Sequence, residues 1–281
     1  MNIFQRLWIN LQLLFNDYAY CKLFRLEDYD IPKLGMESQG MDIYNNRYII
    51  QGSDNTGKLP SLAIIDIKNK KIILEYELPF NGCHMNNINL GIKLNKDYLF
   101  PIFYISECRN KRRCYVVNVS KDLSSCDLIQ EIYFDTKLHY KSLQCPFDWI
   151  VDHFENYIYT FGMTGNYGEM EICKFRLPVF NLKKRTFTDK DVLDSFTVQN
   201  CFTYQGTKII NGKLYAFSGL DTKEYPTYLH IINLQTHEVE NRININGLSE
   251  LEAIGHYEDG FISVNNAYNP TYTFLKIKEK I

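Results

Sequence analysis

Short runs of alternating apolar and polar residues fill the chain, and they recur as one pattern. A polar residue opens a short apolar strand, a tight turn follows, and a second strand rich in Tyr, Phe and Ile comes after the turn. Five copies begin at Gln39, Asn86, Asp148, Gln205 and Glu252, at spacings of 47, 62, 57 and 47 residues. A β-rich repeat of this length is typical of propeller blades. The sequence therefore predicts an all-β fold, a five-bladed β-propeller.

The first repeat indicates how one blade is built. Residues 39–52 form a hairpin around Asn45-Asn46, a pair that favours a type I′ turn, and residues 62–78 form a second hairpin. Four antiparallel strands make one blade. The predicted blades span residues 36–80, 84–135, 146–199, 203–246 and 249–281. The polar run 183–194 is predicted to be an insertion in the third blade, with one helical turn after Thr188.

The N-terminal region lies outside the repeats. Its apolar stretch lacks a small-residue cleavage site, whereas Leu7, Leu11 and Leu14 recur at helical spacing. We expect residues 1–20 to form a short helix, with a vestigial targeting segment as the alternative. The last repeat is one strand short, so residues 22–27 are expected to supply its outer strand and close the ring. Residues 21–281 then form a single propeller domain.

Composition excludes some classes of partner. The chain has 281 residues, of which 45% are hydrophobic and 15% aromatic, enough for a sizeable core. Its net charge is −2, with 31 basic and 33 acidic residues, so no strong field attracts nucleic acid or an anionic membrane. Beyond the N-terminal stretch, no segment approaches the length of a transmembrane span. We expect a monomer that binds neither nucleic acid nor membrane.

The eight cysteines show no Cys-x-x-Cys pair and no zinc-like spacing with histidine. Cys108 and Cys114 flank a short basic segment and are expected to face each other across a hairpin. The alternatives are two reduced thiols or a cross-strand disulfide, which requires an oxidising compartment.

A column of polar residues marks the predicted channel. The first strand of each blade lines the centre of a propeller, and all five first strands begin with an amide or a carboxylate: Gln39, Asn86, Asp148, Gln205 and Glu252. One side-chain period earlier, on the same face of each strand, come Glu37, His84, Pro146, Thr203 and Glu250. We expect one mouth of the channel to gather these carboxylates and amides.

Binding is the leading functional hypothesis. Gln39, Asn86, Asp148, Gln205 and Glu252 would hydrogen-bond a small polar ligand, a glycan or a peptide, and His84 and Trp149 would help to define the pocket. Amides bind sugars and peptides well but are poor general bases, so the presence of Gln39 and Gln205 in place of acids favours binding over catalysis. The polar ring also has a purely structural interpretation, because converging strand starts need partners for their backbone groups.

Three alternatives use other parts of this chemistry. A hydrolase of glycosides or phosphoanhydrides would use Asp148, Glu250 and Glu252, with His84 as acid or base. The same oxygens would suit Ca²⁺, although no metal site is specified and no other cofactor is implied. A third alternative is a protein-interaction scaffold that uses aromatic blade faces.

Several segments resemble uncharacterised propeller proteins of Bacteroidetes. They are residues 84–91 (HMNNINLG), 100–106 (FPIFYIS), 114–117 (CYVV), 175–178 (FRLP) and 188–193 (TDKDVL). More distantly, the repeat is similar to apyrase-, arabinanase- and tachylectin-type propellers over residues 36–281. The first resemblance implies export, whereas the absence of a clear signal peptide indicates the cytoplasm, so the compartment stays open.

Overall fold

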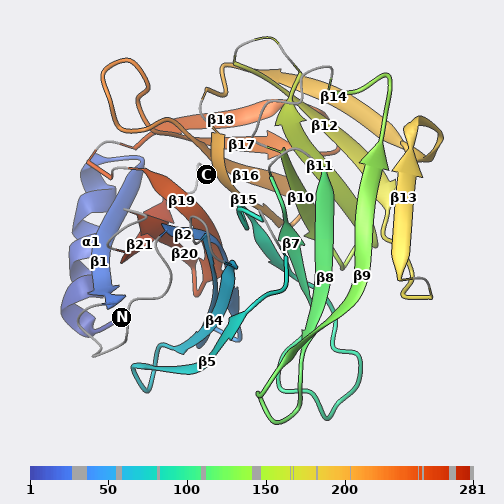
Figure 1. The fold of residues 1–281 in the computed structure, drawn as a ribbon. Coiled ribbons are helices and arrows are strands. Elements are labelled where there is room, and N and C mark those ends of the chain that lie inside the picture. Colours follow the sequence, from blue (N-terminus) through green and yellow to red (C-terminus); the bar gives the residue numbers. More distant parts are fainter. Residues whose placement is uncertain are drawn as a thin grey trace.

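Five small β-sheets form a ring in the computed structural model, which confirms the predicted five-bladed β-propeller (Figure 1). The sheets are antiparallel, apart from one added edge strand. The structure describes residues 1–26, 37–54, 59–80, 83–108, 112–140, 147–164, 166, 168–181, 183–202, 204–245, 247–248, 250–265 and 270–278.

Each blade runs outward from the centre in chain order. The first contains β2 (Glu37–Tyr44), β3 (Tyr48–Asp54), β4 (Ser61–Asp66) and β5 (Lys71–Glu77). The second contains β6 (Ile88–Leu90), β7 (Phe103–Ser106), β8 (Arg113–Val119) and β9 (Cys126–Asp135). The third contains β10 (Phe147–Asp152), β11 (Tyr157–Met163), β12 (Glu169–Arg176) and β14 (Asp194–Gln199). The fourth contains β15 (Tyr204–Ile210), β16 (Lys213–Ser218), β17 (Tyr228–Asn233) and β18 (Val239–Asn244). The last contains β19 (Leu251–Tyr257), β20 (Gly260–Asn265) and β21 (Thr271–Ile277), and β1 (Tyr18–Arg25) is its fourth strand.

The N-terminal strand closes the ring, as predicted. β1 pairs antiparallel with β21, from Tyr18 opposite Ile277 to Arg25 opposite Thr271. The helix α1 (Ile3–Phe15) precedes it and begins after Asn2, whose side chain accepts a hydrogen bond from the backbone of Gln5. The helix is shorter than the predicted 1–20 because the strand begins at Tyr18 rather than at residue 22.

The predicted insertion in the third blade contains a strand. β13 (Lys184–Thr188) leaves the third blade and pairs in parallel with β9, so the second blade has five strands. A single 3-10 turn follows at Asp189–Asp191, where one helical turn was predicted after Thr188. The sequence Lys-Arg-Thr-Phe-Thr carries one apolar side chain, Phe187, which is buried between the second and third blades.

The tight turns explain why the first hairpins form. Asn45 and Asn46 have φ angles of 54° and 50°, the left-handed backbone that a type I′ turn requires. Asn156 and Asn211 occupy the equivalent turns of the third and fourth blades, with φ angles of 59° and 50°. Asparagine tolerates this conformation better than most residues, so these turns fix the register of each inner hairpin.

The hydrophobic core lies between neighbouring blades. One cluster joins Ile50 and Leu62 of the first blade to Phe103 and Val117 of the second, and four similar clusters lie in the other parts of the ring. Both faces of most strands are therefore covered, which is why β4 is buried along its whole length. The ends of the innermost strands lie outside these apolar clusters, and polar side chains occupy them.

Of the two alternatives for Cys108 and Cys114, the cross-strand disulfide is not formed: both side chains are buried and no disulfide joins them. The register places Cys114 opposite Ser106, so Cys108 lies beyond the paired ends of the hairpin. Cys145 lies outside the described residues.

Two glycines permit the inner strands to approach closely. A Cβ added to Gly40 would lie 2.5 Å from the Met85 oxygen and 2.6 Å from the Asn87 Cα. A Cβ added to Gly206 would lie 2.5 Å from the Ala253 Cα. In both Gln-Gly pairs, the glycine therefore permits close packing against the backbone of the neighbouring blade.

Gly40→Ala is expected to lower the free energy of unfolding by about 1 to 3 kcal/mol, since a methyl group would force two backbones apart. Gly206→Ala should have a similar effect. Urea denaturation of both variants measures the cost, and a midpoint equal to that of the parent would contradict the close contact.

Candidate functional site

The innermost strands of the five blades surround the centre of the ring (Figure 1). β2, β6, β10, β15 and β19 contact one another in that order, and β19 contacts β2 to complete the circle. At one end of these strands lie Glu37, His84, Gln205 and Glu250, and Asp54 lies opposite Glu37 at the end of β3; we call these five residues the channel mouth.

Beneath the mouth, the predicted polar column forms a buried layer. Gln39, Asn86, Asp148 and Glu252 are all buried, and Gln205 is partly exposed. Asn86 donates a hydrogen bond from Nδ2 to Oδ1 of Asp148 at 3.1 Å, which joins the second and third blades. Four of the five predicted residues therefore lie too deep for broad contact with solvent.

Two residues outside the column extend this network. The Thr207 hydroxyl donates to Oδ2 of Asp148 at 3.4 Å, and Asn87 Nδ2 donates to the Thr207 hydroxyl at 2.8 Å. Asp148 is thus held by groups from the second and fourth blades. By contrast, Oε1 of Gln39 is buried without a hydrogen-bond partner among the described residues.

A partly exposed group of acidic residues and one histidine lies at the first blade. The His84 Nδ1 and Asp54 Oδ2 atoms are 2.7 Å apart, and one ligand atom from each of Glu37, Asp54 and His84 lies within 4.8 Å of the others. Glu37 stands opposite Asp54 in the hairpin register. Asp54 was not predicted as a site residue, although the turn at Asn45-Asn46 places the end of β3 beside the start of β2.

A second acidic pair lies at the last blade. Burial raises the pKa of Glu252 to about 8, and the negative charges of Glu250 and Glu37 and a hydrogen bond with Glu250 act in the same direction. Burial and a neighbouring negative charge both disfavour the ionised form of a carboxyl group. Glu252 is therefore largely protonated at neutral pH and can donate a hydrogen bond.

One predicted pocket residue lies elsewhere. Trp149 is fully buried in the apolar cluster between the second and third blades, with its ring near Phe147, Phe175 and Phe187. Successive side chains of a strand point to opposite faces, so Asp148 faces the centre and Trp149 faces the neighbouring blade. It cannot define a pocket at the mouth. Pro146 and Thr203 lie outside the described residues.

Two innermost strands also carry charged side chains beyond the polar column, and these were not predicted as part of the site. Asp42 on β2 is buried and forms an ion pair with Lys208 on β15, and its Oδ2 atom accepts a hydrogen bond from the Leu90 backbone at 2.8 Å. Burial and the positive charge of Lys208 lower the pKa of His153 and of His256. Nothing in the sequence pairs Asp42 with Lys208, because they lie in different blades.

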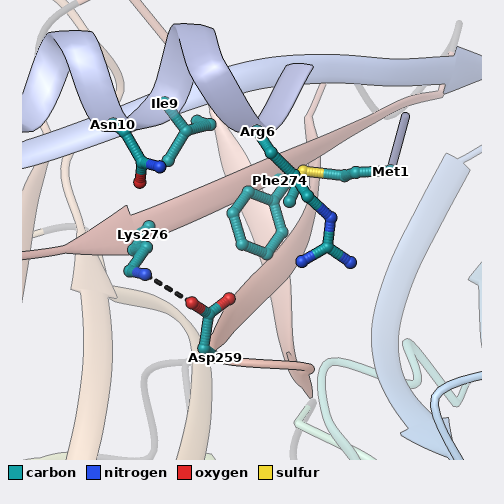
Figure 2. A pocket seen from close by; sticks show the side chains of 7 residues that line it. All are labelled: Met1, Arg6, Ile9, Asn10, Asp259, Phe274 and Lys276. Carbon is teal, nitrogen blue, oxygen red and sulfur yellow. Dashed lines mark hydrogen bonds and ion pairs between the residues drawn. The ribbon is translucent and has the colours of Figure 1, made fainter. Parts of the chain in front are cut away.

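A pocket separate from the mouth lies between α1 and the last blade (Figure 2). It is lined by Met1, Arg6, Ile9, Asn10, Asp259, Phe274 and Lys276, and Lys276 pairs with Asp259. The outer face of the helix is apolar, since Phe4, Trp8 and Phe15 are 78%, 53% and 81% exposed. None of these residues belongs to the predicted site. Among the described residues, no helix has the length and apolar character needed to cross a membrane.

The chain resembles solved structures in its fold. The tail fiber of Staphylococcus aureus phage P68 has a TM-score of 0.58 and 12% identity, over 94% of this chain and 54% of that chain. Kuenenia stuttgartiensis hydrazine synthase gives a TM-score of 0.45 and 9% identity, over 80% of this chain and 61% of that chain. A nidogen/laminin complex gives 0.46 and 9%, over 87% of each.

The similarity to the tail fiber shows the propeller fold alone, and this chain spans about half of that chain. No protein-family model matches the chain, and no curated protein matches it. The resemblance to propellers of Bacteroidetes, apyrases and arabinanases stays a prediction. Function must be argued from the site.

Proposed function

We propose that the protein binds a small polar ligand, a glycan or a peptide, at the channel mouth. The observation that carries this proposal is the two-layered arrangement of polar groups at the inner strand ends. Glu37, His84, Gln205 and Glu250 are partly exposed there, above the buried ring of Gln39, Asn86, Asp148 and Glu252.

The chemistry of the mouth favours a ligand that is rich in hydrogen-bond donors. Glu37, Asp54 and Glu250 supply carboxylate oxygens, which accept strong hydrogen bonds from hydroxyl and ammonium groups. Sugars supply hydroxyl donors of this kind, and peptides supply amine donors. Ca²⁺ would compete for the same oxygens, so it serves as a second probe of the site.

A hydrolase is the second candidate, because Glu252 has its pKa raised to about 8 beside Glu250. A protonated carboxylic acid next to a carboxylate is the arrangement that general acid catalysis uses. In this alternative Glu252 would donate the proton and Glu250 would act as base or nucleophile. Asp148 is fully buried and held by Asn86 and Thr207, so we remove it from the proposed catalytic set.

Thermal unfolding with a panel of neutral oligosaccharides, lysine-containing peptides and Ca²⁺ tests the binding proposal. A ligand at about 100 times its Kd should stabilise the parent by about 2.7 kcal/mol. Gln205→Ala and Glu250→Gln should remove that shift. Glu240→Gln is the matched control, because Glu240 is an exposed carboxylate paired with Lys213 on β16.

Equal stabilisation of all these variants would place the ligand elsewhere, and no shift from any panel member would contradict binding of these ligand classes. Hydrolysis makes a different demand. The rate of product release would follow a bell-shaped pH profile. Glu252→Gln would abolish product release but leave ligand-induced stabilisation in place.

A further inference from the structure

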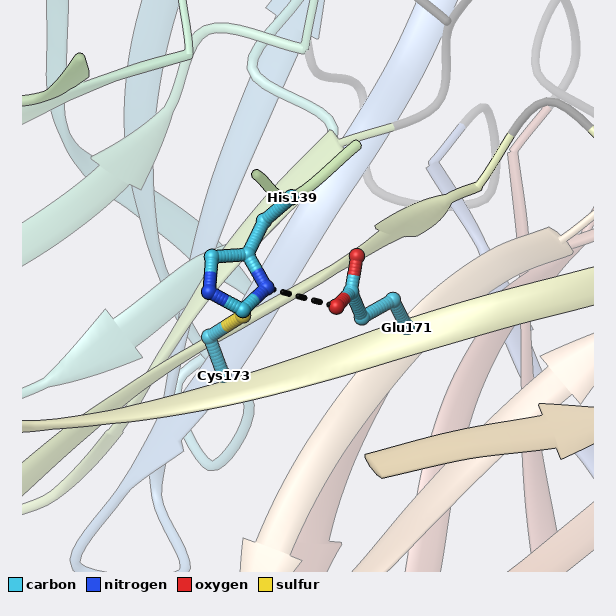
Figure 3. A group of neighbouring side chains, drawn as sticks. All are labelled: His139, Glu171 and Cys173. Carbon is cyan, nitrogen blue, oxygen red and sulfur yellow. Dashed lines mark hydrogen bonds and ion pairs between the residues drawn. The ribbon is translucent and has the colours of Figure 1, made fainter. Parts of the chain in front are cut away.

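Three side chains with metal-binding atoms meet at the junction of the second and third blades, away from the channel residues. They are His139, Glu171 and Cys173, and one ligand atom of each lies within 4.8 Å of the others (Figure 3). Glu171 and Cys173 are two residues apart on β12, so they share one face of the strand. His139 comes from the segment after β9, and Figure 3 shows its ring facing both.

The histidine is fixed by its own segment. The Thr136 hydroxyl oxygen accepts a hydrogen bond from the His139 backbone at 3.0 Å, and the same hydroxyl contacts Asp189 of the 3-10 turn. The backbone of Lys137 donates to Asp189 Oδ2 at 3.0 Å. The segment is thereby attached to the chain that follows β13, which holds the imidazole over β12.

The carboxylate is fixed as well. Glu171 Oε1 lies 2.7 Å from His139 Nδ1, and its Oε2 atom accepts a hydrogen bond from the Tyr140 backbone at 3.0 Å. Tyr140 is itself buried, and its hydroxyl donates to the Glu171 carbonyl at 3.0 Å. Two of the three donors are therefore held in place before any ion arrives, which is the role of supporting hydrogen bonds around protein metal sites.

The sulfur makes this cluster different from the channel mouth. Cys173 is fully buried beneath the imidazole and the carboxylate, whose side chains are each 14% exposed.

We propose that His139, Glu171 and Cys173 form a binding site for Zn²⁺ or a similar divalent transition-metal ion. One nitrogen, one oxygen and one sulfur suit Zn²⁺, whereas Ca²⁺ and Mg²⁺ prefer oxygen ligands alone. With bonds of about 2.0 Å, His139 Nδ1 and Glu171 Oε1 move from 2.7 Å to about 3.3 Å apart. A water molecule on the exposed side would be the fourth ligand.

The ion would connect the second and third blades, since its ligands come from the segment after β9 and from β12. Bound Zn²⁺ would stabilise this junction, and each ligand would lose a proton or an existing partner on binding. The mouth group of Glu37, Asp54 and His84 offers only oxygen and nitrogen ligands. Evidence of a sulfur ligand would therefore distinguish the Cys173 cluster from the channel mouth.

Co²⁺ added to the full-length reduced protein is the first probe, since a thiolate ligand gives a charge-transfer absorption band. The band should appear in the parent and be absent in Cys173→Ser. It should persist in Cys201→Ser, which alters another fully buried cysteine outside the cluster. Failure to observe the band in the parent, or a band that persists in Cys173→Ser, would overturn the assignment.

Zn²⁺ affinity and Zn²⁺-induced thermal stabilisation give a second readout that does not depend on a buried substitution. His139→Ala should weaken binding by more than about tenfold. His237→Ala should leave it unchanged, because His237 makes a comparable 2.7 Å contact with Asp194 outside the cluster. Loss of Zn²⁺ binding in His84→Ala rather than in His139→Ala would place the ion at the channel mouth and contradict the proposal.

Discussion

Glu252→Gln is expected to make the protein more stable than the parent at alkaline pH and to flatten the pH dependence of unfolding. In the folded parent the pKa of Glu252 is raised from 4.5 to about 8. The folded state therefore holds this proton more tightly than the unfolded state. Its contribution to stability is full below pH 4.5 and is lost as the pH rises through 8.

The size of the effect follows from the pKa difference. Each pKa unit corresponds to about 1.4 kcal/mol, so the parent should lose up to about 5 kcal/mol relative to Glu252→Gln between pH 4.5 and pH 9. The amide keeps the shape of the protonated acid and carries no charge. Urea denaturation of both proteins at intervals across this range measures the difference.

Glu250→Gln is the matched control for this prediction. It removes one of the negative charges that raise the pKa of Glu252. The decrease in stability that accompanies ionisation of Glu252 should therefore be complete at a lower pH than in the parent. Parallel profiles for the parent and Glu252→Gln would show that Glu252 ionises normally, and the proposed general acid would then have no basis.

Trp149→Ala is expected to reduce the free energy of unfolding by about 3 to 5 kcal/mol, because it leaves a large cavity between the second and third blades. The side chain is fully buried, and ring centroids of Phe147, Phe175 and Phe187 lie 6.0 to 6.1 Å from its own. Thermal or urea denaturation gives the value directly.

The chain offers a matched control in its other tryptophan. Trp8 is 53% exposed on α1, so Trp8→Ala should change stability by no more than about 0.5 kcal/mol. Trp149→Phe should cost less than Trp149→Ala, because a phenyl ring leaves a smaller cavity than a methyl group does. Equal effects at both tryptophans would contradict the packing between the blades.

The architecture could be predicted from local signals. Asn45 and Asn46 marked a type I′ turn, and the repeated polar residue before each first strand marked the start of a blade. The missing strand of the last repeat indicated that an N-terminal strand would complete it. The turn and the polar residue depend on neighbours in sequence, and the missing strand followed from counting the strands of each repeat, so all three could be identified without coordinates.

Long-range features could not be predicted in this way. β13 joins the second blade although it lies between strands of the third, because its single apolar residue, Phe187, packs between the two. Asp42 and Lys208 come from the first and fourth blades. Nothing local in the chain indicates either association.

The candidate site was predicted in part. Glu37, His84 and Glu250 lie at one mouth, as period-two geometry suggested: His84 lies near Glu37, and the charges of Glu37 and Glu250 both raise the pKa of Glu252 in the buried ring beneath. Trp149 was misplaced because the residue after an inward-facing position points to the other face of the strand. His139 was not singled out from the sequence, since its ligand-like neighbours on β12 lie more than thirty residues away.

The pairing of β1 with β21 has a consequence for synthesis of the chain. The ribosome makes β1 before the other strands of the propeller, and its hydrogen-bonding partner β21 appears only after the first four blades have been translated. During that interval β1 presents an unpaired edge, which is a hazard for association with other chains. Ring closure also requires contact between distant parts of the chain, so it should be a slow step in folding.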